Sequence, residues 1–448
     1  MDEPVSPLDD RYQEELKELG KIFSERSLYY QRFRIELLYL KALCDLGLLD
    51  GECNSYDPDL LLKSLPEDWY MDVKEIEGRT GHDVKSAELY LRKTLSDIGY
   101  SKLAACVHLG LTSEDVNGNA YGIIIEMGKE ELLRCYVQLA MSLAKLARDS
   151  ASTKIMGRTH GVPAVPTTFG KEMAYYALRL IRVSDEVLRI RPYGKLSGAV
   201  GSYNSFKFIN ETVDWYTFSK NFIEKLGLEF PEITKQIPLW DRTSVAMHYI
   251  EMANIIMQEL AQDLWLYNSY GIVKFEKKRV GSSTMPHKIN PVDLEDSEGQ
   301  AEVSNSIINI LSLKLMKTRL QRDLSDSTVR RNVGVAFAHS FLACKRLKMA
   351  LNEMSVIGED VDRYGETISE AFQIAFKLQG DLEGYERVFN NMYRLNELAG
   401  ELNGELKEKL SKIKPSDYIG LSEELAIRGS EQAELLARRV MEELGKRF

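Results

Sequence analysis

Apolar residues recur at the spacing of an α-helix over long stretches of this chain. Steps of three and four residues place side chains on one stripe of a helix, which can then pack against a core. One such stripe consists of Leu132, Tyr136, Leu139, Leu143 and Leu146. The alternation of apolar and polar residues that predicts a β-strand is scarce, and only the stretch 195–203 offers short extended pieces. The pattern therefore predicts an all-α protein.

A repeat of seven residues adds a prediction about how the helices pack. Met173, Leu180 and Val187 are seven residues apart, and Ala177 and Ser184 fill the seam between them. A sustained repeat of this length favours helices that pack nearly parallel in a bundle. Ordinary amphipathic helices that pack irregularly are the alternative.

Prolines and shifts in composition predict the domain boundaries. Because proline ends helices, the proline-free windows 67–162 and 292–414 can hold very long ones. The composition changes just before residue 106 and again near residue 350, after which glycines return and the predicted helices become shorter. We therefore expect an N-terminal helical domain at 1–105, a central long-helix bundle domain at 106–350 and a C-terminal helical domain at 351–448.

The composition argues against several classes of protein. The 448 residues include 68 Asp and Glu against 58 Lys and Arg, so the net charge is 58 − 68 = −10. A general nucleic-acid binder usually carries a basic surplus, so we expect no nucleic-acid partner, although a small anionic ligand needs only a few local cations. No apolar run reaches the roughly 20 residues of a membrane span, and the polar N-terminus MDEPVSPLDDRY is unlike a signal peptide.

The five cysteines are widely spread and include no CxxC pair. This distribution argues against a disulfide framework and against a zinc site, and it suits the reducing cytosol. We therefore expect a cytoplasmic protein without a metal site, whose cysteines are buried thiols that act as small apolar residues. They are Cys44, Cys53, Cys106, Cys135 and Cys344.

One loop between two predicted long helices concentrates reactive side chains. Its sequence GSSTMPHKIN, residues 281–290, contains two serines, a histidine, a lysine and an asparagine. In an extended segment Lys288 and Asn290 face the same way, and a cation beside an amide donor suits a carboxylate. Ser282 could act as a general base, which requires a nearby cation such as Lys288 to stabilise its alkoxide.

Three further stretches carry candidate chemistry, each with a plainer interpretation beside it. His160 is predicted on a loop, where an imidazole can exchange protons near neutral pH, although a single histidine is more often structural. Thr112 and Asp115 fit a capping box at the start of a helix, whose N-terminus can also bind an anion. Ser327 and Arg331 share one helix face and can grip a phosphate, with a solvated charged face as the alternative.

Several of these stretches together resemble one family. The sequence GSSTMPHKINPVDLE, residues 281–295, resembles the signature loop of the fumarase/aspartase superfamily, and the histidine in MPHK is similar to adenylosuccinate lyases within it. Further stretches that resemble adenylosuccinate lyases of the longer bacterial type occur in the expected order, from Ser6 to about Gly420. They are SPLDDRY, RTGHDVKSAE, TSEDVN, RTHGVPAVPTTFGKE, QRDLSDSTVRRN and PSDYIG.

The resemblance implies a fold, a reaction and an assembly. The fold is a three-domain superfamily lyase fold, whose central long-helix bundle forms a multi-helix core in a homotetramer, with each active site assembled from three subunits. The reaction is anti elimination of fumarate from adenylosuccinate, giving AMP, and from SAICAR, giving AICAR, in purine biosynthesis. No metal and no organic cofactor is implied.

The resemblance also implies a role for each matching residue. Ser282 is similar to the general base, His160 to the general acid that protonates the departing nitrogen, and Glu295 to the carboxylate that orients this histidine. The positions that match ligands of the succinyl carboxylates are Ser283, Lys288 and Asn290. The positions that match nucleotide contacts are Arg11, Tyr12, His82, Asp83, Thr112, Ser113, Gln236, Arg322, Ser327 and Arg331.

Two residues depart from the family pattern. Gly81 stands where relatives often have asparagine, so the backbone or water must replace a side-chain contact. Asp296 stands where asparagine is frequent, and it adds negative charge near an anionic substrate, which argues against a direct contact.

Two other functions are alternatives to this one. The first is another lyase of the superfamily, such as argininosuccinate lyase, against which MPHK and the Ser327–Arg331 pair argue. The second is a non-catalytic structural protein on the same scaffold, which would have no need for Ser282, His160 and Lys288 together. A serine hydrolase is disfavoured because the sequence contains no GxSxG elbow.

Overall fold

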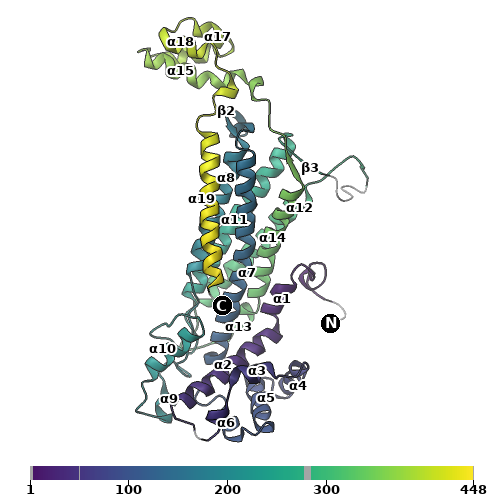
Figure 1. The fold of residues 1–448 in the computed structure, drawn as a ribbon, viewed down its shortest axis with the longest axis vertical. Helices are drawn as coiled ribbons and strands as arrows, with labels where there is room; N and C mark the ends of the chain where they lie inside the picture. The colour runs from purple at the N-terminus through teal and green to yellow at the C-terminus, as the bar shows by residue number, and fades with distance from the viewer. Residues whose placement is uncertain (1–3, 50, 277–283, 447–448) are drawn as a thin grey trace. The chain divides into compact units, whose positions relative to one another are not determined.

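The computed structural model describes residues 4–49, 51–276 and 284–446, and this part of the chain is mostly α-helical (Figure 1). The predicted all-α fold is confirmed. The long helices are α2 (Glu25–Asp45), α7 (Ser113–Asp149), α8 (Phe169–Arg189), α11 (Asp241–Ser269), α12 (Val292–Leu315), α14 (Val333–Glu353) and α19 (Ser422–Gly445). The seven-residue repeat lies in α8, where Met173, Leu180 and Val187 are all buried. The stretch 195–203, in contrast, forms turns and irregular backbone rather than a strand.

The chain divides into two compact units that interleave along the sequence. Unit 1 consists of Met1–Arg134, Glu186–Asn254 and Gln300–Leu342, and unit 2 of Cys135–Asp185, Ile255–Gly299 and Ala343–Phe448. All five internal boundaries fall inside long helices, namely α7, α8, α11, α12 and α14. The division at residues 105 and 350 that the composition suggests stays a prediction.

Unit 1 contains an aromatic core between short helices. Phe33 of α2 stacks on Tyr90 of α5 (Asp83–Asp97), with ring centroids 5.3 Å apart. Its ring centroid also lies 5.1 Å from that of Trp69 in α4 (Trp69–Thr80). Such aromatic pairs add to the stability that burial alone provides. The shorter elements of unit 1 are η1 (Pro7–Asp9), α1 (Lys17–Phe23), η2 (Cys53–Ser55), α3 (Pro58–Lys63), α4 (Trp69–Thr80), α5 (Asp83–Asp97), α6 (Ser101–Ala105), α9 (Asn204–Ile209), α10 (Trp215–Lys225) and α13 (Ser325–Arg330).

The expectation that all cysteines are free thiols is wrong for one pair in unit 1. Cys44 lies in the last turn of α2, and the chain turns back so that Cys53, in η2, forms a disulfide with it. Spacing along the sequence could not reveal this pair because the turn brings together residues that match no disulfide or metal motif. Cys106, Cys135 and Cys344 are free, as expected, and Cys135 and Cys344 are buried.

Unit 2 contains two small antiparallel pairs of strands. Strand β1 (Lys154–Thr159) pairs with β2 (Val162–Thr168), and β3 (Val273–Phe275) pairs with β4 (Met354–Val356). The β1–β2 hairpin turns at His160 and Gly161, which have φ angles of 55° and 78°. Glycine adopts this left-handed conformation freely, whereas a histidine in it is uncommon.

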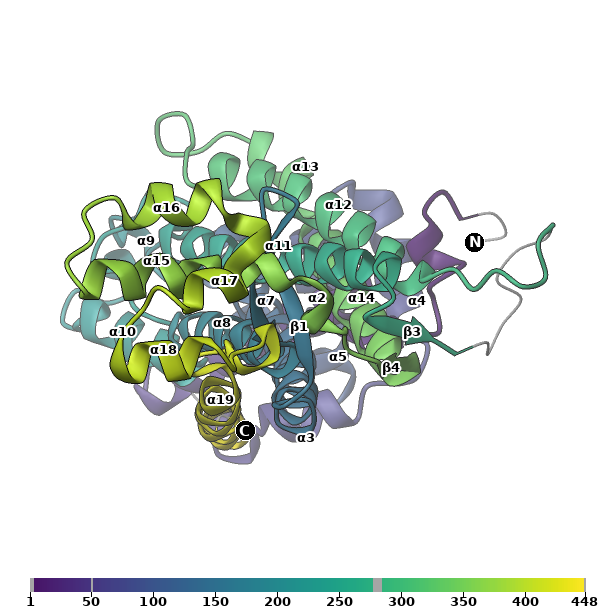
Figure 2. The ribbon, with the colours of Figure 1, turned by 90° about the horizontal axis from the view of Figure 1, so that it is seen from above.

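A group of short helices follows α14 and has its own core. Figure 2 shows α15 (Ser369–Leu378), α16 (Gly384–Asn390), α17 (Leu395–Ala399) and α18 (Gly404–Leu410) gathered together. Phe372 and Leu402 are buried between them. The 3₁₀ segments of unit 2 are η3 (Val361–Arg363), η4 (Gly365–Ile368), η5 (Met392–Arg394) and η6 (Pro415–Asp417).

Helix α19 lies along α8 in unit 2 (Figure 1). A Cβ on Gly429 would lie 2.9 Å from the Cβ of Ala174, so this close approach requires glycine. Arg439 of α19 forms an ion pair with Asp185 of α8 at 2.6 Å.

Candidate active site

A cavity of about 800 Å³ in unit 1 gathers most of the predicted nucleotide contacts. The starts of α5 and α7, the segment before α11, the turn before α13 and α13 itself supply its walls. The predicted residues that line it are His82, Asp83, Thr112, Ser113, Gln236, Arg322, Ser327 and Arg331. Residues from four stretches that are far apart in sequence thus line one cavity, which is large enough for a small-molecule ligand.

The wall at α5 begins with a histidine that caps the helix. The ring Nδ1 of His82 accepts a hydrogen bond from the backbone N–H of Lys85 at 3.3 Å. Gly81 precedes it with a φ of 63° and ends α4 in the left-handed conformation. Glycine favours this backbone, so the departure from the family pattern at this position fits the local geometry. Gly81 itself lines the cavity.

Asp83 is held in place by a buried arginine that the sequence did not single out. The guanidinium of Arg32 donates to Asp83 at 2.5 Å and to the Oδ1 of Asn117 at 2.8 Å. Arg32 lies in α2, is 2% exposed and stacks over the ring of Tyr29. The sequence feature that could have revealed Arg32 is a charged residue among the apolar positions of α2, because a buried charge needs a partner.

The wall at α7 is fixed by a buried ion pair. Asp115 is fully buried and accepts from the Nζ of Lys195 at 2.6 Å and from the backbone N–H of Ser197 at 2.9 Å. Its second oxygen accepts from the backbone N–H of Thr112 at 2.8 Å. This last bond is one half of the predicted capping box. Burial lowers the pKa of Lys195, and the carboxylate of Asp115 offsets only part of that effect.

A second buried carboxylate contacts two arginines beside the cavity. Glu114 accepts from Arg330 through both oxygens, at 2.9 and 3.2 Å, and its Oε1 lies 2.9 Å from the Nη1 of Arg322. Burial alone would raise the pKa of Glu114, but the two guanidinium groups outweigh it and lower the pKa to about 2. Glu114 is therefore ionised throughout the physiological pH range.

Two predicted nucleotide contacts do not line this cavity. Arg11 is exposed and Tyr12 is half-buried in the segment between η1 and α1, with the Arg11 guanidinium 5.9 Å from the Tyr12 ring centroid.

The predicted acid and its carboxylate lie in unit 2. His160 is exposed at the turn of the β1–β2 hairpin, and Glu295 is exposed in the first turn of α12. Within the described residues they do not bond to each other, and Glu295 instead accepts from the indole N–H of Trp265 at 3.2 Å. Asp296, the second departure from the family pattern, accepts from the Nε of Arg346 at 2.6 Å. Its negative charge is thus balanced within the same unit.

The predicted ligands of the carboxylates lie partly outside the described residues. Ser282 and Ser283 belong to the part of the chain that the structure does not describe. Lys288 is exposed and Asn290 is half-buried in the irregular segment before α12, where the backbone N–H of Lys288 donates to the carbonyl of Met285 at 3.0 Å.

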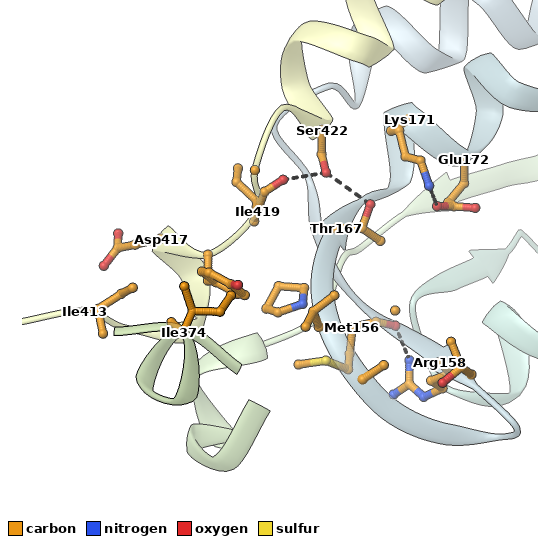
Figure 3. Close-up of a pocket in the computed structure, with 18 of the residues that line it drawn as sticks. Met156, Arg158, Thr167, Lys171, Glu172, Ile374, Ile413, Asp417, Ile419 and Ser422 are labelled. Atoms are coloured by element: carbon orange, nitrogen blue, oxygen red, sulfur yellow. Dashed lines mark hydrogen bonds and ion pairs between the residues drawn. The ribbon is translucent and has the colours of Figure 1, made fainter. Parts of the chain in front are cut away.

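The hairpin also borders a second cavity of about 1050 Å³, which lies in unit 2 (Figure 3). Its apolar wall comes from α15 and α18, and its polar wall includes Arg158, Lys171 and Glu172. Arg158 is held by two hydrogen bonds to Glu359, of which the shorter is 2.7 Å. Burial would raise the pKa of Glu359, but the ion pair with Arg158 and hydrogen bonds from the Met156 backbone and Tyr364 together outweigh it and lower the pKa to about 2. Neither His160 nor Glu295, the two predicted catalytic residues within the described part of the chain, lines this cavity.

Among the described residues, no group of three or more His, Cys, Asp or Glu side chains is arranged to hold a metal ion. No helix in this part of the chain is both long and apolar enough to cross a membrane.

Comparison with known proteins relates the whole chain to one group of lyases. A family model described as Lyase matches residues 10–303, and one described as Adenylosuccinate lyase C-terminal matches residues 318–419. The chain is 33% identical to an adenylosuccinate lyase of Legionella pneumophila (strain Corby), covering 94% of this chain and 97% of that protein. It is 34% identical to an adenylosuccinate lyase of Buchnera aphidicola, covering 94% and 96%.

A solved structure shares the fold at lower identity. The crystal structure of a fumarate lyase from Mesorhizobium sp. BNC1 superposes with a TM-score of 0.76 at 18% identity, covering 93% of this chain and 97% of that one. This likeness concerns the fold alone, and it agrees with the lyase fold that the sequence predicts.

Proposed function

We propose, because the chain belongs to the adenylosuccinate lyase family, that it cleaves the C–N bond of adenylosuccinate to give fumarate and AMP. The same elimination would convert SAICAR to AICAR and fumarate. The observation that carries this proposal is the cavity of unit 1, which combines eight of the predicted nucleotide contacts. We call it the nucleotide cavity.

The nucleotide cavity has the chemistry that a phosphorylated nucleoside requires. Arg322 and Arg331 supply cationic groups that can bind a phosphate, and the hydroxyl of Ser327 can donate to it. The N-terminus of α7, a helix of 37 residues, opens onto the cavity at Thr112 and Ser113 and favours negative charge there. Gln236 is fixed by its bond to the carbonyl of Ala199 at 2.8 Å.

The proposed elimination needs a base and an acid on opposite sides of the substrate. Ser282 takes the proton from the succinyl carbon, the electrons of that C–H bond form the C=C bond of fumarate, and the C–N bond breaks. His160 gives its proton to the departing nitrogen. Lys288 and Asn290 stabilise the carboxylate on which negative charge builds, which lowers the barrier only if they bind that state more strongly than the ground state.

We further propose that the sites are shared between subunits of a homotetramer. His160 is exposed on a hairpin and Glu295 bonds to Trp265, so a partner subunit would have to complete the environment of each. Within unit 1, exposed apolar residues repeat at intervals of seven, which favours packing against another long helix. They are Val245 and Met252 on α11, and Val303 and Ile310 on α12.

We also propose a cytoplasmic location and small-molecule substrates only. The proposed substrates carry a phosphate and carboxylates, and such charged molecules do not cross a lipid bilayer unaided. The enzyme would therefore need to be in the compartment where they are made.

The proposal is tested by mixing the purified protein with adenylosuccinate, SAICAR or argininosuccinate in separate reactions and measuring fumarate. We expect fumarate from the first two and none from the third. Fumarate from argininosuccinate alone would favour the other superfamily lyase. No fumarate from any of the three would favour a structural protein on this scaffold.

A further inference from the structure

One carboxylate beside the nucleotide cavity links two arginines that differ in their access to a ligand. Arg330 is 3% exposed, and its guanidinium stacks on the ring of Tyr121 with 4.4 Å to the centroid. It lines the cavity, but only 4% of its side chain is exposed, which leaves little of its surface for a bound molecule. Arg322 has a side chain that is 12% exposed, on the turn before α13. Glu114 lies between them and contacts both.

The contacts of Glu114 indicate that Arg330 fixes the carboxylate, and that the carboxylate in turn holds Arg322. Arg330 grips both carboxylate oxygens at 2.9 and 3.2 Å, and this bidentate arrangement fixes the orientation of the carboxylate. Glu114 also lies in the first turn of α7, so its backbone is rigid. One of its oxygens then lies 2.9 Å from the Nη1 of Arg322. The carboxylate is thus held by the guanidinium of Arg330 and by the rigid backbone of α7, whether or not Arg322 contacts it.

Apart from Glu114, the guanidinium of Arg322 has one weaker ionic contact in the described structure. The nearest other carboxylate, Asp326, lies 3.7 Å from its Nη2, which is beyond hydrogen-bonding distance. A long arginine side chain on a turn has many rotamers, and a phosphate would have to select one at a cost in affinity. A fixed carboxylate removes that cost because the guanidinium is already oriented.

We propose that Glu114 is a positioning residue, which, anchored by Arg330, holds the Arg322 guanidinium in the orientation that binds the substrate phosphate. This inference rests on the proposed function, since it assumes that Arg322 contacts a nucleotide phosphate. Glu114 itself does not touch the phosphate, because two anions in contact would repel each other.

A different role for Glu114 would leave a different signature. If the carboxylate only neutralised the two arginines, its removal would leave more positive charge at the cavity and strengthen phosphate binding. If it only stabilised the fold, its alteration would weaken the binding of every ligand to the same extent. The phosphate-specific part of the affinity therefore separates the three roles.

The deciding variant is Glu114→Asp, which keeps the charge but withdraws the carboxylate by one methylene. Calorimetric titration gives the Kd for AMP and for adenosine, and their ratio reports the contribution of the phosphate. We expect Glu114→Asp to weaken AMP binding by roughly tenfold or more, in line with the cost of small misplacements at binding sites, while adenosine binding changes less than about twofold. In an Arg322→Ala background the same substitution should have no further effect on the ratio.

A matched control and a second variant complete the test. Glu36→Asp alters another fully buried carboxylate of unit 1, which bonds to His108 and does not line the cavity, and it should leave the ratio unchanged. If Glu114→Asp does not fold, Glu114→Gln, which keeps the size of the side chain, should lower the preference for AMP. An unchanged ratio, a higher preference for AMP, or equal weakening of both ligands would overturn the proposal.

Turnover of adenylosuccinate, measured in parallel, tests the proposed lyase activity separately from the positioning role of Glu114. A wild-type protein that prefers AMP to adenosine but releases no fumarate would contradict the proposed function and leave the role of Glu114 open to measurement by the Kd ratio. A wild-type protein without any preference for AMP would overturn the positioning role of Glu114 directly.

Discussion

The substitution Asp115→Asn should leave a buried lysine without its counter-charge. Lys195 and Asp115 are both fully buried, and the Nζ of Lys195 donates to Asp115 and to the carbonyl of Gly198, each at 2.6 Å. Asparagine has nearly the same size as aspartate, so the packing is retained while the charge is lost. The perturbation is therefore polar rather than steric, since it removes the charge and replaces one of the two acceptor oxygens by an NH2 group.

The expected cost follows from the burial of the pair. Removing one partner of a buried ion pair destabilises a protein by about 3–5 kcal/mol, because the other charge stays in a poorly solvating interior. The double variant Asp115→Asn with Lys195→Met removes both charges, so it should cost less than the sum of the two single substitutions. A surface pair would contribute only about 0–1 kcal/mol, so the burial decides the magnitude.

The stability penalty of Asp115→Asn should depend on pH in a direction that follows from the pKa of Lys195. The pKa of Lys195 in the folded protein lies below its value in the unfolded chain, so between the two values the unfolded chain binds more protons and stability rises with pH. Without Asp115 the pKa of Lys195 falls further, and the lysine can be buried in its neutral form at a lower pH. The stability penalty of Asp115→Asn should therefore shrink as the pH rises from neutral towards the ordinary lysine range.

Thermal melts at a fixed protein concentration, from pH 7 to about pH 9.5, measure this penalty. We expect Asp115→Asn to lower the Tm by about 3–5 °C at pH 7, with a smaller difference at the alkaline end. An unaltered Tm, or a difference that grows with pH, would refute the electrostatic account of this pair.

Three further outcomes are expected. His160→Ala and Ser282→Ala should each fold, as judged by circular dichroism, while kcat for adenylosuccinate falls by roughly 10²–10⁴, the usual contribution of acid or base catalysis. A near-normal kcat in either variant would contradict the role of the replaced residue as acid or base. Replacing both Cys44 and Cys53 by alanine should lower the free energy of unfolding, measured in urea, by about 2–3 kcal/mol, because the short loop that they close is freed in the unfolded chain; treatment of this variant with a reductant should then have no further effect on stability. Because the pKa of Glu359 is lowered to about 2, this carboxylate stabilises the fold above the ordinary pKa of a glutamate, and the stabilisation is lost as the pH falls towards 2. The Tm difference between wild type and Glu359→Gln should therefore become smaller in acid. A Tm difference that grows in acid would contradict this.

The sequence predicted the long helices and eight of the residues that line the nucleotide cavity. Regular apolar spacing depends on local geometry, so a helix such as α7 can be recognised without its partners. His82 and Arg322 could be placed together only through resemblance, because no pattern in one chain states which distant stretches meet. The structure gathers them in one cavity, although Arg11 and Tyr12 lie elsewhere in the described chain.

The supporting residues of the cavity escaped prediction for a physical reason. Arg32, Glu114 and Lys195 contact side chains that are distant in sequence. For Arg32 and Glu114, which lie on helices, a charged residue is by default assigned to the solvated face. Only burial reveals that such a charge needs a partner. The disulfide between Cys44 and Cys53 escaped for a similar reason, since it depends on how the chain turns after α2.

The central claim is that Ser282 and His160, brought together from different subunits, act on one substrate. Equal amounts of the Ser282→Ala and His160→Ala proteins are mixed under conditions that let subunits exchange, and adenylosuccinate turnover is then measured. With random assortment in a tetramer, about a quarter of the sites receive both intact residues, so turnover should recover to about a quarter of the wild-type value. If the mixture, with exchange verified by light scattering and mass spectrometry, is no more active than the separate variants, the two residues do not meet across a subunit boundary and the claim is wrong.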